Sequence, residues 1–564
     1  MATHTDRNEL RGGTHLYDAL VNAGIEVLVG LPGTQTLPLD RIVAERDEMQ
    51  YVMARHETSV PHVAWGYYEA SGVPAATLTI PGPGDTNAMH GLKNAAEDCV
   101  PIIHVSADVD PADRGKSPIH EIEPMTYDSV VKVNYSVESQ GELTETVERA
   151  IETALTPPYG PVRIGVPSGI LEASFEAKSV TVDGERVTYD NRFTYEAAIA
   201  TIRRAERPLV YIGGGARRSP GGPEAVNDLI EAINAPVLST YKGKGVFPED
   251  DPRFLGISAK HLPTSAKEVL AAADVVLALG TDFDGVTTAD WSLPMGDSLV
   301  HVNIDAQEFD GAYDADVSVV ADVATAAERL EAGLDDDDSP SMDSWDGAEV
   351  ASAAQAEFDE RLDQSGLLSD DPIHTPGALR TVRDVLPRDG MVTTDIGGFR
   401  LWAKQVFEAY GPHEYVTAGS WAGMGVGLPA AIGAKLARPD RDVVSLTGDG
   451  GLMMSLTELH TAVEYGLSLP VIVFNNSDYG IISQSPKIVE YGDGRQFSWN
   501  SPDFGAIAEG FGCRGVAVGT RTELAAEFRD ALDADQPTLL DVKIPTDDPS
   551  VVNIADFAPS LSFE

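Results

Sequence analysis

Residues 443–476 read VVSLTGDGGLMMSLTELHTAVEYGLSLPVIVFNN. The apolar, β-branched runs at the two ends predict two buried strands, Val443–Thr447 and Pro470–Asn475. The segment between them has helical periodicity, and a strand–helix–strand unit of this kind favours a parallel sheet. Gly448–Asp449–Gly450 and Asn475–Asn476 then both lie at the carboxyl edge of that sheet, where α/β folds bind their ligands.

These two motifs offer the oxygen ligands that a hard divalent cation such as Mg²⁺ prefers. Asp449 supplies a carboxylate, Asn476 an amide oxygen, and a backbone carbonyl near Asp478 completes the expected metal set. Glycines beside Asp449 let the backbone approach a diphosphate, and the amides of the following helix face it. Either motif alone is an ordinary turn or loop. Together, at this spacing and between strands, they predict a metal-assisted diphosphate site.

The same alternation of buried strands and helices runs along the whole chain, which favours parallel sheets covered on both faces. The expected fold class is α/β, with three doubly wound parallel-sheet domains at residues 1–180, 190–333 and 371–564. An acidic linker is expected at 334–370, because residues 335–338 are all aspartate. Further strands are predicted at Glu26–Gly30, Ala75–Ile80, Ile102–Ser106, Val162–Val166, Pro208–Gly215, Asp274–Gly280, His301–Asp305, Met391–Thr394 and Thr538–Ile544.

The charge balance is strongly acidic: 40 Lys and Arg residues face 89 Asp and Glu residues in 564, a formal charge of −49. Such a surface repels nucleic acid and anionic membranes, so neither is an expected partner. The acids are spread along the chain, which favours a surface adapted to high salt over an acidic tail. Two cysteines cannot form a disulfide framework. The sequence shows no leader peptide or long apolar run, and a cytoplasmic protein is expected.

The two motifs together resemble the thiamine diphosphate-binding motif, and the resemblance to thiamine diphosphate-dependent enzymes covers nearly the whole chain. Arg55–His56–Glu57, Pro81–Gly84 and Gly425–Gly433 are similar to landmarks of the acetolactate synthase large subunits. The resemblance implies a pyrimidine-binding, a central nucleotide-binding-like and a diphosphate-binding domain, in that order. It also implies thiamine diphosphate and Mg²⁺ as cofactors, and decarboxylation and carboligation of 2-oxo acids as the reaction.

The resemblance assigns roles to individual residues. Glu57 matches the glutamate that hydrogen-bonds the aminopyrimidine ring of the cofactor and begins catalysis. Met424 matches the bulky side chain that lies between the two cofactor rings. His120 stands where the synthases have glutamine and is a candidate proton shuttle or substrate contact, whereas the other histidines of the first domain are expected to be structural. The implied cofactor-binding set is Glu57, Asn87, Gly398, Phe399, Met424, Gly448, Asp449, Gly450, Gly451 and Asn476, and the metal set is Asp449, Asn476 and Asp478.

Some substrate residues depart from the synthase pattern. Gly280–Val286 reads GTDFDGV, so Asp282 and Val286 replace two arginines, one that contacts flavin and one that binds the carboxylate of the second 2-oxo acid. Ser485 replaces a tryptophan that selects the acceptor. Two alternatives for the central domain therefore stay open: it binds FAD as a further cofactor, or it binds no ligand. Two alternative functions also stay open: a non-flavin 2-oxo acid decarboxylase similar to benzoylformate decarboxylase, and a non-catalytic thiamine-binding paralogue.

The resemblance also implies an assembly. The cofactor is expected between the first domain of one subunit and the third domain of another, which requires a homodimer or homotetramer. A small regulatory subunit stays open as a further partner, and a small 2-oxo acid is the expected substrate.

Overall fold

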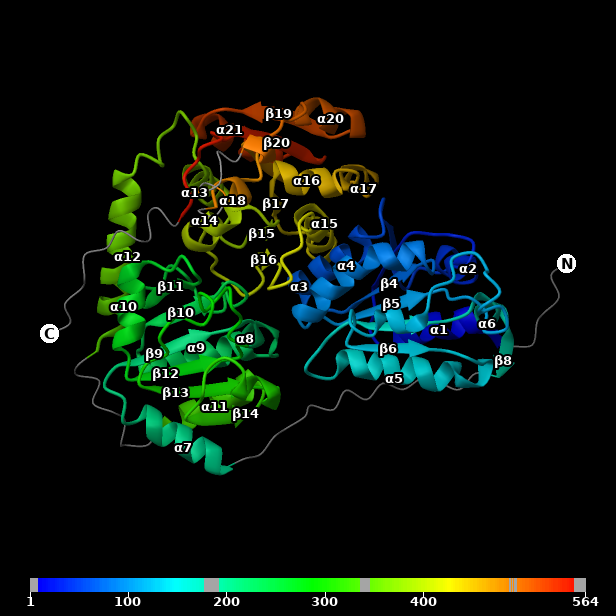
Figure 1. Cartoon of the computed structure of the whole chain (residues 1–564), viewed down its shortest axis with the longest axis horizontal. Helices are drawn as coiled ribbons and strands as arrows, with labels where there is room; N and C mark the ends of the chain where they lie inside the picture. The colour runs from blue at the N-terminus through cyan, green and yellow to red at the C-terminus, as the bar shows by residue number, and fades with distance from the viewer. Residues whose placement is uncertain are drawn as a thin grey trace.

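The N-terminal domain, blue and cyan in Figure 1, is built on a six-stranded parallel sheet, and its strand order is β3-β2-β4-β5-β7-β6. The computed structural model describes residues 9–176, 192–334, 345–485, 488, 490 and 495–551. The strands of this sheet are β2 (Val27–Gly30), β3 (Gln50–Met53), β4 (Ala75–Thr79), β5 (Ile102–Ser106), β6 (Val133–Ser136) and β7 (Val162–Gly165). Its main helices are α1 (Gly12–Asn22), α2 (Leu37–Glu45), α3 (Ser59–Ser71), α4 (Pro83–Glu97) and α5 (Leu143–Leu155). A short antiparallel pair, β1 (Glu9–Arg11) with β8 (Ser174–Glu176), closes the domain.

The central domain has a second parallel sheet, ordered β11-β10-β9-β12-β13-β14. The strand order reverses between β9 and β12, which is the position where doubly wound sheets open a ligand crevice. The strands are β9 (Pro208–Ile212), β10 (Val237–Thr240), β11 (Phe254–Ser258), β12 (Val275–Leu279), β13 (Ser298–Asn303) and β14 (Val317–Val320). The helices are α7 (Arg192–Ile202), α8 (Gly214–Arg218), α9 (Gly222–Ile233), α10 (Thr264–Ala272) and α11 (Val323–Leu334).

The C-terminal domain repeats the strand order of the N-terminal domain, here as β16-β15-β17-β18-β20-β19. If the six strands of each sheet are numbered along the chain, both sheets have the order second, first, third, fourth, sixth, fifth. The strands are β15 (Met391–Thr394), β16 (Tyr415–Thr417), β17 (Val443–Gly448), β18 (Pro470–Asn475), β19 (Arg514–Val518) and β20 (Thr538–Lys543). The helices are α13 (Thr375–Val385), α14 (Gly398–Val406), α15 (Gly427–Ala437), α16 (Asp449–Ser455), α17 (Glu458–Glu464), α18 (Gly480–Ser483), α20 (Phe504–Phe511) and α21 (Arg521–Leu532). Three parallel six-stranded sheets confirm the expected α/β class.

The two outer domains meet through helices α3 and α15, which lie side by side at the centre of the molecule (Figure 1). Glycines allow this close approach. A Cβ on Gly66 would lie 2.2 Å from the carbonyl oxygen of Ala430, and one on Gly433 would lie 2.0 Å from that of Val63. Both glycines have helical φ, so the reason for glycine here is space rather than backbone conformation.

A buried ionic cluster joins all three domains. Lys242, in the turn after β10, places its Nζ 3.2 Å from a carboxylate oxygen of Glu69 and 3.1 Å from one of Asp98. The same nitrogen donates to the carbonyl of Thr417 at the end of β16, at 2.8 Å. Arg217 of α8 also donates to Glu69. Because every charge in the cluster has an opposite partner, burial of these groups is tolerated.

Two expectations about local structure differ from what the structure shows. Residues 347–364, inside the expected acidic linker, form the 18-residue helix α12, capped by the Asp346 carboxylate and packed through buried Ala351, Phe358 and Leu362. The Asp-rich part of that linker, at 335–344, lies outside the described residues. The single helix expected between the two metal-site strands is divided at Leu456 and Thr457 into α16 and α17. No helix in the described parts of the chain is long and apolar enough to cross a bilayer.

Candidate active site

The structure brings the two C-terminal motifs together at the carboxyl edge of their sheet. Strands β17 and β18 are parallel neighbours, with Gly448 opposite Phe474, so Asp449 and Asn475 leave the sheet side by side. The Ser501 hydroxyl lies between them, 3.2 Å from an Asp449 carboxylate oxygen and 2.9 Å from Asn475 Oδ1. The backbone of Ser477 also hydrogen-bonds Asp449. The Asp449 carboxylate therefore faces the turn that carries Asn476.

Asp449 is a buried carboxylate without a cationic partner among the described residues. Its side chain is 2% exposed, and burial raises its pKa to about 6, against hydrogen bonds from Gly450 and Ser501 that lower it. An uncompensated buried carboxylate gains from a bound cation, which restores the ionised form. Asp449 thus fits the role of a metal ligand.

The remaining donors form a mixed set of oxygens. Asn476 Oδ1 accepts from the backbone N–H of Asp478 at 3.2 Å, which folds the turn so that its carbonyl groups lie near the amide. The Asp478 carboxylate is occupied by the hydroxyls of Ser498, at 2.9 Å, and Ser483. These bonds hold the side chain toward Ser483 and Ser498, which leaves the backbone carbonyl as the expected ligand. In the described ranges no three His, Cys, Asp or Glu side chains form a metal cluster, so a site here must combine one carboxylate with amide and backbone oxygens.

Small residues keep the space above this edge open. A Cβ on Gly450 would lie 2.5 Å from the Tyr479 ring, so only glycine fits beneath that side chain. A Cβ on Gly451 would meet the Asp395 carboxylate at 2.8 Å, whereas Gly398 borders open space, with Ile481 4.0 Å away. Phe399 is different: its ring is 5% exposed and stacks on Phe474 at 4.9 Å. Phe399 can offer a diphosphate only its backbone, not its side chain.

Asp395 anchors the loop that carries Met424. Its carboxylate accepts from the backbone N–H groups of Gly425, at 2.9 Å, and Gly427, at 3.3 Å. Burial raises the pKa of Asp395, and these hydrogen bonds oppose the rise. Met424 itself is half-buried and precedes Gly425, whose φ of +84° turns the chain into α15. The loop therefore presents Met424 from a fixed backbone.

The predicted residues of the N-terminal domain form a second cluster, at the carboxyl edge of its own sheet. Asn87 Nδ2 donates to a carboxylate oxygen of Glu57 at 3.0 Å. A Cβ on Gly84 would lie 3.7 Å from the other Glu57 oxygen, and one on Gly82 would lie 2.7 Å from the His120 carbonyl. His120 has a φ of +66°, and its Nδ1 is 3.1 Å from Gln35 Nε2. Glu57, Asn87 and His120 thus surround one short stretch of glycine-rich backbone.

The backbone around Glu57 is held by the C-terminal domain of the same chain. The Glu458 carboxylate of α17 accepts from the backbone N–H groups of Arg55 and His56 at 3.0 and 3.1 Å. The Arg55 side chain donates to His460 Nδ1 at 3.0 Å and pairs with Glu464. The Arg55 side chain is therefore engaged by the C-terminal domain and not by Glu57.

Sequence reasoning missed several residues of these clusters. Ser501 and Glu458 carry no local motif, because their partners lie far away in the chain. Gln35 likewise meets His120 only through the fold, across 85 residues of sequence. Asp395 was not among the predicted site residues. The one signal available for Asp395 was its position directly after a buried strand, where parallel sheets gather polar side chains.

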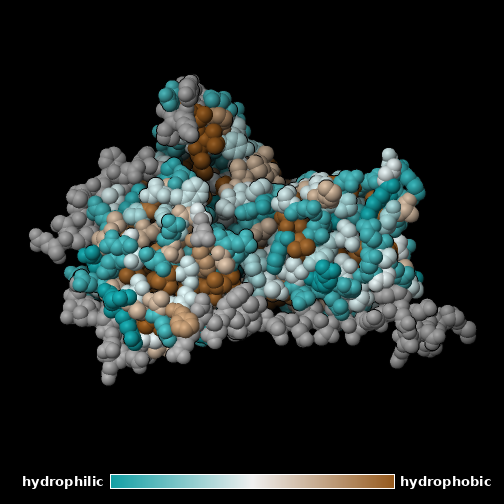
Figure 2. All heavy atoms as spheres, turned by 60° about the horizontal axis from the view of Figure 1, so that its bottom comes forward, coloured by the Kyte–Doolittle hydropathy of each residue, from teal (hydrophilic) through white to brown (hydrophobic). Residues whose placement is uncertain are grey.

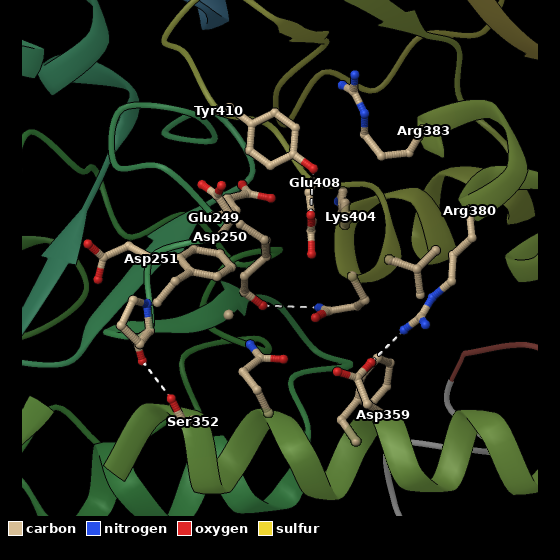
Figure 3. A pocket seen from close by; sticks show the side chains of 18 of the residues that line it. Glu249, Asp250, Asp251, Ser352, Asp359, Arg380, Arg383, Lys404, Glu408 and Tyr410 are labelled. Carbon is tan, nitrogen blue, oxygen red and sulfur yellow. Dashed lines mark hydrogen bonds and ion pairs between the residues drawn. The ribbon is translucent and has the colours of Figure 1, made fainter. Parts of the chain in front are cut away.

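A large cavity lies away from these two clusters. It measures about 670 Å³ and is lined by the central domain, α12 and the C-terminal domain (Figure 3). Its charged groups satisfy one another: Arg380 pairs with Asp359, and Arg388 pairs with Asp250. None of the predicted cofactor residues lines it.

Comparison with known proteins follows the same three-domain division. The thiamine pyrophosphate enzyme N-terminal TPP binding domain matches residues 10–128, the central domain matches residues 195–330, and the C-terminal TPP binding domain matches residues 395–542. Thiamine pyrophosphate is another name for thiamine diphosphate. Three such domains, in this order and on these three sheets, define a thiamine pyrophosphate-dependent enzyme.

Several curated relatives are similar over nearly the whole chain. The acetolactate synthase large subunit of Parasynechococcus marenigrum is 30% identical, with 95% of this chain and 88% of the relative covered. Isozyme 1 of Escherichia coli is 29% identical, over 96% of this chain and 95% of the relative. The probable acetolactate synthase large subunit of Methanocaldococcus jannaschii is 28% identical, over 95% and 92%. The chain belongs to the thiamine pyrophosphate enzyme family, as the sequence motifs predicted.

Proposed function

We propose that this enzyme uses thiamine diphosphate and Mg²⁺ to decarboxylate a 2-oxo acid and to join the resulting acyl unit to a second carbonyl compound, as an acetolactate synthase does. The observation that carries the proposal is the buried Asp449 carboxylate facing the turn of Asn476 across two neighbouring strand ends. The relatives named acetolactate synthase, over nearly the full length of the chain, support the reaction type.

The C-terminal residues hold the cofactor through its diphosphate. Asp449, the Asn476 amide and the Asp478 carbonyl are the proposed Mg²⁺ ligands, an all-oxygen set of the kind this ion prefers. Gly398, Gly448, Gly450 and Gly451 leave room for the phosphates to approach the backbone. When bound, thiamine diphosphate supplies a nucleophilic thiazolium carbon that adds to the carbonyl of a 2-oxo acid.

The N-terminal residues manage protons. Glu57 is oriented by Asn87, which occupies one carboxylate oxygen and leaves the other to bond the aminopyrimidine ring. His120, fixed through its Nδ1 by Gln35, keeps Nε2 free for a substrate oxygen. Met424 separates the two rings of the cofactor by its bulk, from a loop that Asp395 anchors. Each of these proposed roles is performed by a side chain of this protein.

The replacement Glu57→Gln tests the catalytic assignment. The amide keeps the shape of the carboxylate but cannot exchange the proton, so turnover of pyruvate should fall by about 10²–10⁴-fold. Exchange of the cofactor C2 proton, followed by NMR in D₂O, should slow in parallel. Glu45→Gln, an exposed glutamate at the end of α2, is the matched control and should behave as the wild type. Unchanged exchange in Glu57→Gln would refute the role of Glu57.

A simple 2-oxo acid decarboxylase is the second candidate, because Asp282 and Val286 lack the guanidinium groups expected to hold a second 2-oxo acid. Product analysis with pyruvate separates the two reactions. A carboligase releases acetolactate, whereas a decarboxylase releases acetaldehyde. A protein that binds thiamine diphosphate tightly but yields neither product, with slow C2 exchange, would be the non-catalytic paralogue.

The central cavity does not suit FAD. It measures about 350 Å³ at the strand-order reversal of the central sheet, which is small for a dinucleotide. Burial and repulsion by Asp284 raise the pKa of Asp282 in its wall. The lining contains seven carboxylates, Glu97, Asp98, Asp282, Asp284, Asp305, Glu308 and Asp322, against three cations, Lys93, Arg218 and Lys242. A flavin diphosphate would be repelled there. We infer a flavin-free enzyme, whose activity added FAD does not change and whose visible spectrum lacks flavin.

We also infer a homodimer or homotetramer whose cofactor sites combine Glu57 of one subunit with Asn476 of another. Exposed apolar side chains flank the C-terminal cluster, Met453 and Met454 on α16 and Ile481 and Ile482 on α18, as an interface requires. The "large subunit" names of the relatives suggest a small regulatory partner. The reaction needs no membrane or nucleic acid, which is consistent with a cytoplasmic location.

Subunit mixing tests that arrangement. Glu57→Gln and Asn476→Ala chains are each expected to be inactive. If the two residues act across subunits, a mixed dimer contains one intact site, and co-expression should restore roughly a quarter of wild-type activity. Sites within single chains would restore none. An active monomer in sedimentation would also contradict the inference.

A further inference from the structure

The loop between β16 and α15, residues 418–426, is held at both ends. At its start, the Gly419 backbone N–H donates to an Asp98 carboxylate oxygen at 3.2 Å. At its end, Asp395 accepts from Gly425 and Gly427. Between these anchors Ala422 has a φ of +49°, which is unfavourable for a residue with a Cβ. Something must hold the middle of the loop in this conformation.

His90 of helix α4 lies against the middle of this loop and holds it. The indole Nε1–H of Trp421 donates to His90 Nδ1 at 3.1 Å, and the imidazole also hydrogen-bonds the backbone of Met424. A Cβ on Gly423 would lie 1.9 Å from His90 Cε1, so the ring fills the space under the loop. Because Nδ1 accepts from Trp421, the neutral ring carries its proton on Nε2. His90 therefore contacts the loop at Trp421, Gly423 and Met424.

The same helix also serves Glu57. One turn before His90, Asn87 donates to the Glu57 carboxylate, and at the end of the helix Asp98 holds Gly419. Helix α4 thus fixes Glu57 and the Met424 loop in one rigid frame. We propose that His90, as its neutral Nε2–H tautomer, is a positioning residue that sets the place of Met424 against the cofactor. This inference rests on the proposed role of Met424 in the thiamine diphosphate site.

The electrostatic surroundings favour the neutral ring. Burial lowers the pKa of His90, and the hydrogen bond to Met424 only partly opposes this. His62 of α3 meets it edge-on, with ring centroids 5.0 Å apart, and Lys93 of α4 lies 5.9 Å above the Trp421 ring. No carboxylate is recorded among the described groups that influence His90. A proton added to Nδ1 would remove the acceptor that Trp421 uses among the described residues and loosen the loop.

Three variants test the proposal. Trp421→Phe removes the donor but keeps an aromatic ring, and His90→Ala removes both contacts. Both should lower kcat about tenfold or more, with a much smaller change in KM, because the fold and the substrate contacts remain. His90→Asn places an amide oxygen where Nδ1 was, cannot titrate, and should restore kcat to within about threefold of wild type. Lys93→Ala, on the same helix and also beside Trp421, is the matched control and should stay near wild type.

Trp421 fluorescence gives a readout that does not depend on activity. The emission of Trp421, taken as the difference between wild type and Trp421→Phe, should change as His90 gains a proton on acidification, and this step should vanish in His90→Asn. If the fluorescence step is present but the protein shows no thiamine diphosphate-dependent turnover, the His90 contact is supported and the proposed function is wrong. An active enzyme with no step, or with wild-type kcat in His90→Ala, would overturn the positioning role.

Discussion

At the scale of single residues, burial decides which side chains are charged. His62 of α3 is 1% exposed, and neither ring nitrogen has a hydrogen-bond partner within the described residues. Burial, with a smaller contribution from neighbouring His90, lowers its pKa to about 3 from an ordinary value of 6.5. The native protein therefore keeps His62 neutral at pH 5 and above.

This shift predicts acid sensitivity. Between pH 6.5 and 3 the unfolded chain binds a proton at His62 that the native chain does not, so the free energy of unfolding falls as the pH falls. The loss attributable to His62 should reach about 2 kcal/mol at pH 5. Thermal unfolding of wild type and His62→Asn, followed from pH 7 to pH 5, measures it.

The slope with pH is the decisive quantity, because the buried amide of His62→Asn carries its own cost. His15, His90, His301 and His413 also have lowered pKa values and give both proteins the same background slope. The variant should lose stability less steeply than the wild type. Equal slopes would show that His62 is protonated in the native state or accessible to water.

The approach of Asp449 to the turn of Asn476 was predictable because both residues follow strands that are neighbours in the chain and in the sheet. Ser501, Glu458 and Gln35 were not, because each meets its partner across a large separation in sequence. The role of Phe399 depends on the rotamer of its ring, which packs against Phe474 and could not be deduced from its position in a glycine turn.

At the scale of elements, the sequence located the inner strands and missed the outer ones. Strands β5, β15 and β18 have the predicted bounds. The six edge strands, β3, β6, β11, β14, β16 and β19, were not predicted, and neither was the inner strand β10. Four of the edge strands, β3, β6, β14 and β19, are partly exposed, so their sequences lack a continuous apolar run. Helix α12 was missed for a related reason, because polar residues flank its narrow buried stripe.

The crossing of α3 and α15 predicts a sharp contrast between two glycine replacements. In Gly433→Ala the new methyl group meets the Val63 carbonyl oxygen at 2.0 Å, so the helices must separate. Overpacking of this kind should lower the free energy of unfolding by about 1–3 kcal/mol. Chemical denaturation of the purified variant measures the change.

Gly510→Ala is the matched replacement. Gly510 lies in helix α20, and a Cβ there has nothing within 4 Å. Alanine has the higher helix propensity, so this variant should gain up to about 1 kcal/mol. If Gly433→Ala were as stable as Gly510→Ala, the two helices would not be in contact in solution.

At the scale of the whole molecule, the net charge of −49 dominates. Hydrophilic residues cover most of the face in Figure 2, interrupted by separate hydrophobic patches. Most carboxylates therefore repel one another through water, which opposes the compact state. The ionic cluster of Lys242 is an exception, because its charges are paired and shielded from solvent.

Salt should accordingly stabilise the protein. Raising KCl from about 0.1 M to about 1 M shortens the screening length from about 10 Å to about 3 Å. The melting temperature should rise over this range, with most of the gain reached before about 1 M. A rise that instead continued linearly with concentration would indicate exclusion of salt from the surface, and a flat response would contradict the electrostatic account.

The reciprocal fit of α3 and α15 gives the chain an internal dyad. Each helix follows the second strand of its sheet. The two glycine contacts are reciprocal: Gly66 of α3 meets Ala430 of α15, and Gly433 of α15 meets Val63 of α3. Glu57 precedes Gly66 by as many residues as Met424 precedes Gly433. Glu57 and Met424 thus occupy equivalent positions in two domains that share one strand order. In a pair of chains, we therefore expect the loop before α3 of one chain and the loop before α15 of the other to contact the same coenzyme from two sides.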